Sequence, residues 1–235
     1  VMPGIEKSGY KFATVHTDAE RMAWSAIWSA RLMGFDCVVI PYDMTMESEA
    51  MGNTISLYED SEDILYPTIP EKIWSEMDEV VIPDNIEQLG RLPIIPKAIE
   101  IIKKEAPELP IGCWQLGPFT QCGQTIELDK VLKGVFKKKD QVGAILDRFT
   151  DMIIVIGKAL QEAGADYISC TLGWQESIYP VISRDIPMGN WIHLAKRAKE
   201  HVNIPIQMAY RLFRPGLPDE KIDLNELDIW EMCRP

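Results

Sequence analysis

The stretch Gly34-Phe35-Asp36-Cys37-Val38-Val39-Ile40-Pro41 joins the end of a helix to the start of a strand, and it decides the fold class. Asp36 to Pro41 is a short apolar run with β-branched residues, which is typical of a buried strand in a parallel sheet. Residues 17–34 before it carry apolar side chains at helical spacing. Thr17 and Glu20 are spaced as a capping box at the start of this helix, and Gly34 ends it.

The same helix-to-strand step recurs along the chain. Further strands are predicted at 109–115, 166–171, 203–209 and 228–233, and helices at 94–105, 131–136, 142–163, 190–201 and 219–227. Strands that alternate with helices predict a parallel sheet with right-handed crossovers. We therefore expect one α/β domain over residues 1–235, of the TIM-type (βα) barrel class. A full barrel has eight strands, so five predict either an incomplete or chimeric barrel or further strands inside the irregular segment 42–92.

Composition excludes several classes of protein. The formal net charge of −12 disfavours binding to nucleic acid or to an anionic membrane surface, and the short run Lys137 to Lys139 is interpreted as a solvated helix end. The five cysteines form no CxxC pair, so we expect reduced thiols in a cytoplasmic protein. No stretch is long and apolar enough for a membrane span. An open sheet would leave unpaired edges, which makes a homo-oligomer plausible.

Residues that follow the predicted strands are the candidates for chemistry, because active sites of parallel α/β sheets lie at the carboxyl ends of the strands. Glu47 and Glu49 could supply a general base or a metal ligand, or they could be two solvated carboxylates that cap a turn. The other candidates for a small-molecule substrate site are Tyr42, Gln115, Gly117, Thr120 and Trp174.

Three further sets of residues leave alternatives open. Gly117 to Thr120 reads as a tight turn that either lets the backbone approach a ligand or is purely structural. His16 is a substrate-binding candidate, but it lies just before a helix cap and favours a surface or capping role. Arg211 and Arg234 follow late strands, where they could contact a phosphate or form surface ion pairs.

Residues 14–169 resemble the uroporphyrinogen decarboxylase superfamily, and within it the methylcobamide:coenzyme M methyltransferase branch. The matching segments are 15–22, 34–41, Thr45-Met46-Glu47-Ser48-Glu49-Ala50-Met51-Gly52, 90–95, Gly117-Pro118-Phe119-Thr120 and 162–166. This resemblance implies corrinoid-dependent methyl transfer to a thiol, with a corrinoid protein as a possible partner and with Glu47 and Glu49 near the site. Members of that branch hold zinc with a His-x-Cys motif. None of the five cysteines follows a histidine by two positions, so we expect no metal site.

Residues 164–235 resemble the last part of the old yellow enzyme barrel, in the branch of 2,4-dienoyl-CoA reductase. The segments that match are 164–166, 173–176, 187–189, 204–206 and 232–235. This second resemblance implies FMN, whose phosphate Arg211 and Arg234 would bind. The chain therefore has three readings: a methyltransferase-like protein, an FMN-dependent oxidoreductase, or a non-catalytic chimeric or engineered barrel joined near residue 169.

Overall fold

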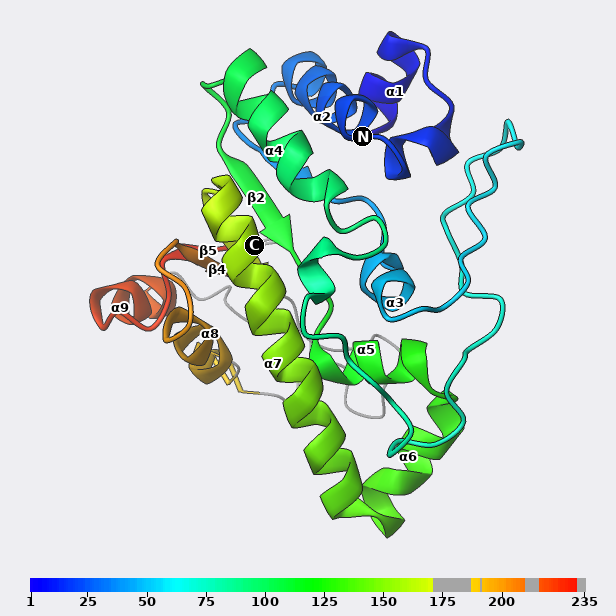
Figure 1. Ribbon diagram of the computed structural model, residues 1–235. Helices are drawn as coiled ribbons and strands as arrows, with labels where there is room; N and C mark the ends of the chain where they lie inside the picture. Colours follow the sequence, from blue (N-terminus) through cyan, green and yellow to red (C-terminus); the bar gives the residue numbers. More distant parts are fainter. Residues whose placement is uncertain (171–186, 191, 210–215, 232–235) are drawn as a thin grey trace.

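The computed structural model describes residues 1–170, 187–190, 192–209 and 216–231 (Figure 1). Three candidates from the sequence, Trp174, Arg211 and Arg234, lie outside these residues. In the described part of the chain, no helix is both long and apolar enough to cross a membrane.

Five parallel strands form one sheet in the order β1-β2-β3-β4-β5. The strands are β1 (Val38–Ile40), β2 (Ile111–Trp114), β3 (Tyr167–Cys170), β4 (Ile206–Met208) and β5 (Ile229–Trp230). Each pairs with the next strand in the chain, as in the register Val39 to Gly112. Sequential parallel pairing through helical crossovers is the pattern of a TIM-type βα barrel, so the predicted fold class is confirmed. Among the described residues the sheet stays open between β5 and β1.

The connecting helices cover the sheet and complete the βα units (Figure 1). Before β1 come α1 (Met2–Ser8), the 3-10 helix η1 (Phe12–His16) and α2 (Ala19–Met33). Between β1 and β2 lie α3 (Met46–Ala50), the 3-10 helix η2 (Ile86–Gln88) and α4 (Ile94–Glu105). Next are α5 (Pro118–Thr125), α6 (Leu128–Lys137) and α7 (Lys139–Ala163), and later α8 (Ile192–Lys199) and α9 (Leu217–Asp223). Helices α2, α4 and α7 pack side by side against the first strands.

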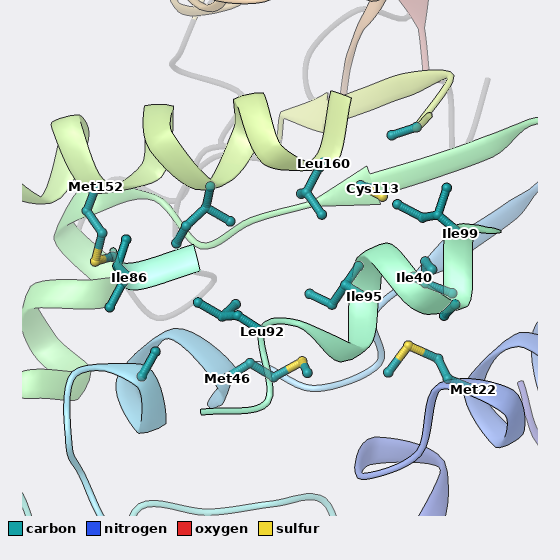
Figure 2. Close-up of a cluster of buried hydrophobic side chains, with 14 of the residues drawn as sticks. Met22, Ile40, Met46, Ile86, Leu92, Ile95, Ile99, Cys113, Met152 and Leu160 are labelled. Carbon is teal, nitrogen blue, oxygen red and sulfur yellow. The ribbon is translucent and has the colours of Figure 1, made fainter. Parts of the chain in front are cut away.

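The main core fills the space between these helices and strands β1 and β2. Figure 2 shows Ile40 of β1 and Cys113 of β2 facing Ile95 and Ile99 of α4, with Leu160 of α7 beside them. Burying a side chain of this size contributes about 1.5–3 kcal/mol, so this core holds the carboxyl end of β1 in place. A smaller core of buried side chains lies under α8 and comprises Ile168, Ile192, Ala195, Ile206, Met208 and Leu227.

The helix ends follow from a few local residues. Gly34 and Gly164 end α2 and α7 in the left-handed conformation, at φ of 69° and 100°, which a side chain would disfavour. Both ends agree with the prediction. The start of α2 corrects it: Asp18, not Thr17, is the cap, and its Oδ1 accepts a hydrogen bond from the Arg21 backbone N–H at 2.8 Å. An aspartate one residue along thus satisfies one of the unpaired N–H groups at the helix start, that of Arg21.

Five short elements escaped the sequence analysis: α1, η1, α3, η2 and α5. Each spans eight residues or fewer, so a helical repeat of apolar residues has little room to show itself. The segment 117–120, expected to be a tight turn, is instead the start of α5, with Gly117 as the N-cap. Pro118 at the first position suits a helix start, because its missing N–H would have no partner there.

Candidate functional site

The candidate site begins where β1 ends. Asp43 and Thr45 follow the strand and are buried. The Asp43 carboxylate accepts hydrogen bonds from both the backbone N–H and the hydroxyl of Thr45, each at 2.8 Å. Such a turn orients the Asp43 side chain at the carboxyl edge of the sheet, the usual place for chemistry in this architecture.

Arg91 connects this turn to the start of α3. Its Nη1 donates to the Asp43 carboxylate and to the backbone carbonyl of His16 (3.1 Å), and its Nη2 donates to the Thr45 hydroxyl at 3.0 Å. Its Nε and backbone N–H both donate to Oε2 of Glu49, at 2.6 and 3.1 Å. The guanidinium thus forms ion pairs with two carboxylates, those of Asp43 and Glu49. We call Asp43, Thr45, Glu49 and Arg91 the Arg91 network.

Glu47 precedes Glu49 by two residues in α3, but it is not part of the Arg91 network. Its side chain is buried, and no ion pair to it occurs among the described residues. Loss of solvation, the largest effect, raises the pKa of Glu47 to about 7 together with the nearby Asp43 charge and against the opposing effect of Gln121 and backbone polar groups. The amide of Gln121 is itself fully buried, yet neither of its polar atoms has a hydrogen-bond partner of acceptable geometry in the described structure.

His16 approaches the same network from η1. It is fully buried rather than at the surface, which corrects the capping role that the sequence favoured. Both ring nitrogens lack a hydrogen-bond partner within the described part of the chain, and the ring packs edge-on against Phe12 at 5.1 Å and near Tyr66 at 6.1 Å. Burial lowers the pKa of His16 to about 4, so the ring is neutral at pH 7.

Unpaired buried polar atoms are uncommon in proteins and need a reason. Here the His16 ring lies near Asp43 and Arg91 of the network, and the Gln121 amide lies beside Glu47. A bound polar molecule or ordered water would satisfy such atoms. The arrangement therefore offers a buried carboxyl group of near-neutral pKa, Glu47, beside a rigid charged support.

The other described candidates from the sequence do not belong to the Arg91 network. Tyr42 packs against the small core of α1 and η1, and burial raises the pKa of its hydroxyl. The Gln115 side chain lies against Gly157 of α7. Gly117 and Thr120 are at the start of α5, where Gly117 is exposed and a Cβ on it would meet open space.

Four residues of the site were not among the candidates chosen from the sequence: Asp43, Thr45, Arg91 and Gln121. Asp43 carried a usable signal, because it directly follows a strand and precedes Thr45 by two residues. Arg91 lies 42 residues after Glu49, beyond an irregular segment, and nothing in its spacing pairs it with that carboxylate. Gln121 is a buried residue of helix α5, which begins directly after its N-cap Gly117. The sequence analysis interpreted this segment as a turn.

The donor set does not fit a protein-held metal ion. Among the described residues, no group of three or more His, Cys, Asp and Glu side chains is arranged to bind one. The carboxylates of Asp43 and Glu49 are already paired with Arg91, whose positive charge disfavours a cation beside them.

Comparison with known proteins identifies the family. Residues 4–208 match the family model described as uroporphyrinogen decarboxylase (URO-D). The chain is 31% identical over 167 residues to the methylcobamide:CoM methyltransferase MtaA of Methanosarcina barkeri. This alignment covers 70% of this chain and 48% of that protein. A solved methyltransferase from Methanosarcina mazei superposes with a TM-score of 0.71 at 26% identity, over 87% of this chain and 60% of that one.

A second solved structure bears on the flavin alternative. It is a complex of 2-naphthoyl-CoA reductase, with a TM-score of 0.51 at 19% identity, over 92% of this chain and 27% of that one. At this identity the likeness shows a shared fold alone. The chain spans about half the length of the curated methyltransferase that it matches. The family match covers most of the 235 residues, and the chain therefore belongs to the uroporphyrinogen decarboxylase family.

Proposed function

We propose that this chain takes part in corrinoid-dependent methyl transfer to a thiol, with Glu47 as the group that accepts the thiol proton. The observation that carries the proposal is the Glu47 carboxyl group, buried at the carboxyl edge of the sheet with a pKa raised to about 7. The relatedness to methylcobamide:CoM methyltransferases supplies the reaction class.

The chemistry of the acceptor explains why such a carboxyl group is useful. Only the thiolate is a good nucleophile, and a free thiol has a pKa of about 8.5. A carboxylate with an ordinary pKa near 4.5 is too weak a base to take this proton at neutral pH. Desolvation brings the pKa of Glu47 to within about two units of the thiol, so proton transfer costs little.

A methylated corrinoid would supply the methyl group when bound and keep both electrons of the broken cobalt–carbon bond. The thiol sulfur gains the methyl group as its proton passes to Glu47. Asp43 and Arg91 contribute in another way, because their ion pair fixes the turn that leads into α3 and so fixes Glu47. We assign Glu49 to the same positioning role, since Arg91 holds its carboxylate.

The remaining candidates enter the proposal with different roles. His16, neutral and without hydrogen-bond partners in the described structure, is proposed to contact the polar part of the thiol substrate. Gly117 and Thr120 are proposed to border the mouth of the site, because α5 starts at the carboxyl end of β2. The FMN alternative depends on Arg211 and Arg234, which lie outside the described residues, and it stays a prediction.

The test is a methyl-transfer assay with the full chain. Methylcobalamin and coenzyme M are mixed with the protein, and loss of the methylcobalamin absorption band is followed with time. We expect transfer by the wild type, and a loss of about 10²-fold or more in Glu47→Gln if the proton acceptor is removed. A control, Glu105→Gln on the exposed end of α4, should leave the rate unchanged. An absorption spectrum with a flavin band and no methyl transfer would contradict the proposal.

A further inference from the structure

Helix α6 is apolar on two sides, which is unusual for a helix at the surface. One side is buried: Val131 is fully inaccessible, and a Cβ on Gly134 would press against Val142 of α7. The other side exposes four apolar side chains at positions i, i+4, i+7 and i+8. These four, which we call the α6 face, are Leu128 (39% exposed), Leu132 (47%), Val135 (36%) and Phe136 (82%).

Lysines surround the α6 face in a chain whose net charge is −12. The five, found within residues 128–139 against a single aspartate, are Lys130, Lys133, Lys137, Lys138 and Lys139. Lys130 and Lys133 pair with acidic neighbours. The other three, which we call the basic cluster, are exposed and form no ion pair within the described part of the chain.

The basic cluster lies where two helices meet. Lys137 and Lys138 end α6, where positive charge favours the helix dipole, whereas Lys138 and Lys139 begin α7, where positive charge opposes the dipole by about 0.3–1 kcal/mol per charge. Because these effects have opposite signs, the helix dipoles alone do not account for three neighbouring lysines at this position.

The α6 face lies at the functional end of the molecule. Helix α5 begins where β2 ends, α6 follows it directly, and α7 then returns toward the start of β3 (Figure 1). Helix α3, which carries Glu47, packs against α5. The α6 face and the basic cluster therefore lie beyond the carboxyl edge of the sheet, one helix away from α3.

We propose that the α6 face and the basic cluster dock an acidic protein that delivers the methyl-carrying group to the site. The proposal deepens the proposed function and rests on it for what the partner carries. Charge complementarity favours this occupant, because a negative surface would meet the lysines while an apolar patch covers Leu132 and Phe136. Aromatic and aliphatic side chains ringed by charge are the usual anchors of such interfaces.

The same charges argue against two other occupants. A parallel twofold pairing of α6 faces from two copies would bring the two basic clusters together, and like charges in an interface are strongly unfavourable. An antiparallel pairing would separate the clusters, and a measurement of self-association tests it. An anionic lipid surface would attract the cluster but would repel the rest of a chain of charge −12. A ten-residue helix offers little apolar area to offset that repulsion.

The experiment compares two methyl donors with the full chain: free methylcobalamin, and a methylated corrinoid protein of net negative charge. Two α6 variants are used, Leu132→Glu with Phe136→Glu, and Lys137→Glu with Lys138→Glu and Lys139→Glu. Matched controls carry the same kinds of change at the opposite edge of the sheet: Leu32→Glu on α2 (52% exposed) and Lys104→Glu on α4. Binding of the corrinoid protein is measured separately by sedimentation.

We expect both α6 variants to lose about tenfold or more in kcat/KM and in binding with the corrinoid protein, and to keep wild-type rates with free methylcobalamin. The controls should behave as wild type with both donors. Wild type that binds the corrinoid protein through α6 but transfers no methyl group would refute the proposed function and keep the docking surface. Wild type that is active with methylcobalamin yet does not bind the corrinoid protein would overturn the docking proposal alone.

Two other results would also overturn it. Binding of the wild type to vesicles of phosphatidylserine and phosphatidylcholine, lost in the α6 variants, would assign the face to a membrane. Self-association of the chain that disappears in the same variants would assign it to a second copy.

Discussion

Removing Arg91 is expected to be the most damaging single change to the site. Arg91 is buried, and it uses three side-chain nitrogens on different partners: Asp43, Glu49 and Thr45. In Arg91→Ala the Asp43 carboxylate, 1% exposed, stays buried without its counter-charge. Breaking a buried ion pair from one side costs about 3–5 kcal/mol, and we expect a loss in that range.

The measurement is urea unfolding followed by tryptophan fluorescence, for which the chain has seven tryptophans. Urea is preferred because guanidinium chloride would screen the charges under study. By thermal unfolding the same loss corresponds to a fall in Tm of about 6–20 °C for a chain of this size. Arg91→Lys should recover less than half of the loss, since a single ammonium group cannot replace three contacts fixed by a planar guanidinium.

A surface ion pair is the control. Lys104 pairs with Glu105 and is 83% exposed, so Lys104→Ala should change the free energy of unfolding by about 0–1 kcal/mol. If Arg91→Ala unfolds within about 1 kcal/mol of the wild type, the Arg91 network does not hold the site together. The positioning roles given to Asp43 and Glu49 would then be refuted as well.

Further predictions concern stability against pH and the packing of the sheet. Between pH 4.5 and about 7 the folded protein keeps a proton on Glu47 that the unfolded chain has lost, so the contribution of Glu47 to the free energy of unfolding falls as the pH rises; Glu47→Gln should remove this contribution and gain up to about 3 kcal/mol at pH 8, measured by urea unfolding. Between about pH 4 and 6.5 the unfolded chain holds a proton that neutral His16 lacks, so the contribution of His16 rises with pH and opposes that of Glu47; His16→Gln should make the free energy of unfolding fall more steeply with pH than in the wild type, and an unchanged slope would contradict the lowered pKa. Gly112→Ala should cost about 1–3 kcal/mol, because its Cβ would overlap the ring of Tyr167 on β3, whereas Gly143→Ala in open space on α7 should stabilise by up to about 1 kcal/mol; equal effects would show that the ring moves aside freely.

The sequence predicted the sheet well because its strands are short apolar runs between periodic helices. The predicted helix at 94–105 agrees with α4 at both ends, and Gly164 ends α7 as expected. All five strands occur near their predicted positions, in a single sheet of sequential parallel pairs. Local patterns are sufficient here, since each helix and strand buries one continuous face.

The site was harder to predict because its contacts join distant segments. Glu47, chosen as a residue that follows a strand, is buried there, but Glu49, chosen with it, pairs with an arginine 42 residues away. The burial of His16 depends on Phe12 and Tyr66 closing over it, and nothing local reveals that. A raised pKa likewise comes from tertiary desolvation, which residue spacing does not express.

The most direct test of the proposed role of Glu47 is the pH dependence of methyl transfer from methylcobalamin to coenzyme M. The wild-type rate at limiting methylcobalamin should rise with pH through an inflection near 7, where Glu47 loses its proton and becomes able to accept one from the thiol. In Glu47→Gln the residual rate should lack this inflection and rise only near the pKa of the thiol itself. A variant that keeps the inflection near 7 would show that another group accepts the proton, and the central claim would be wrong.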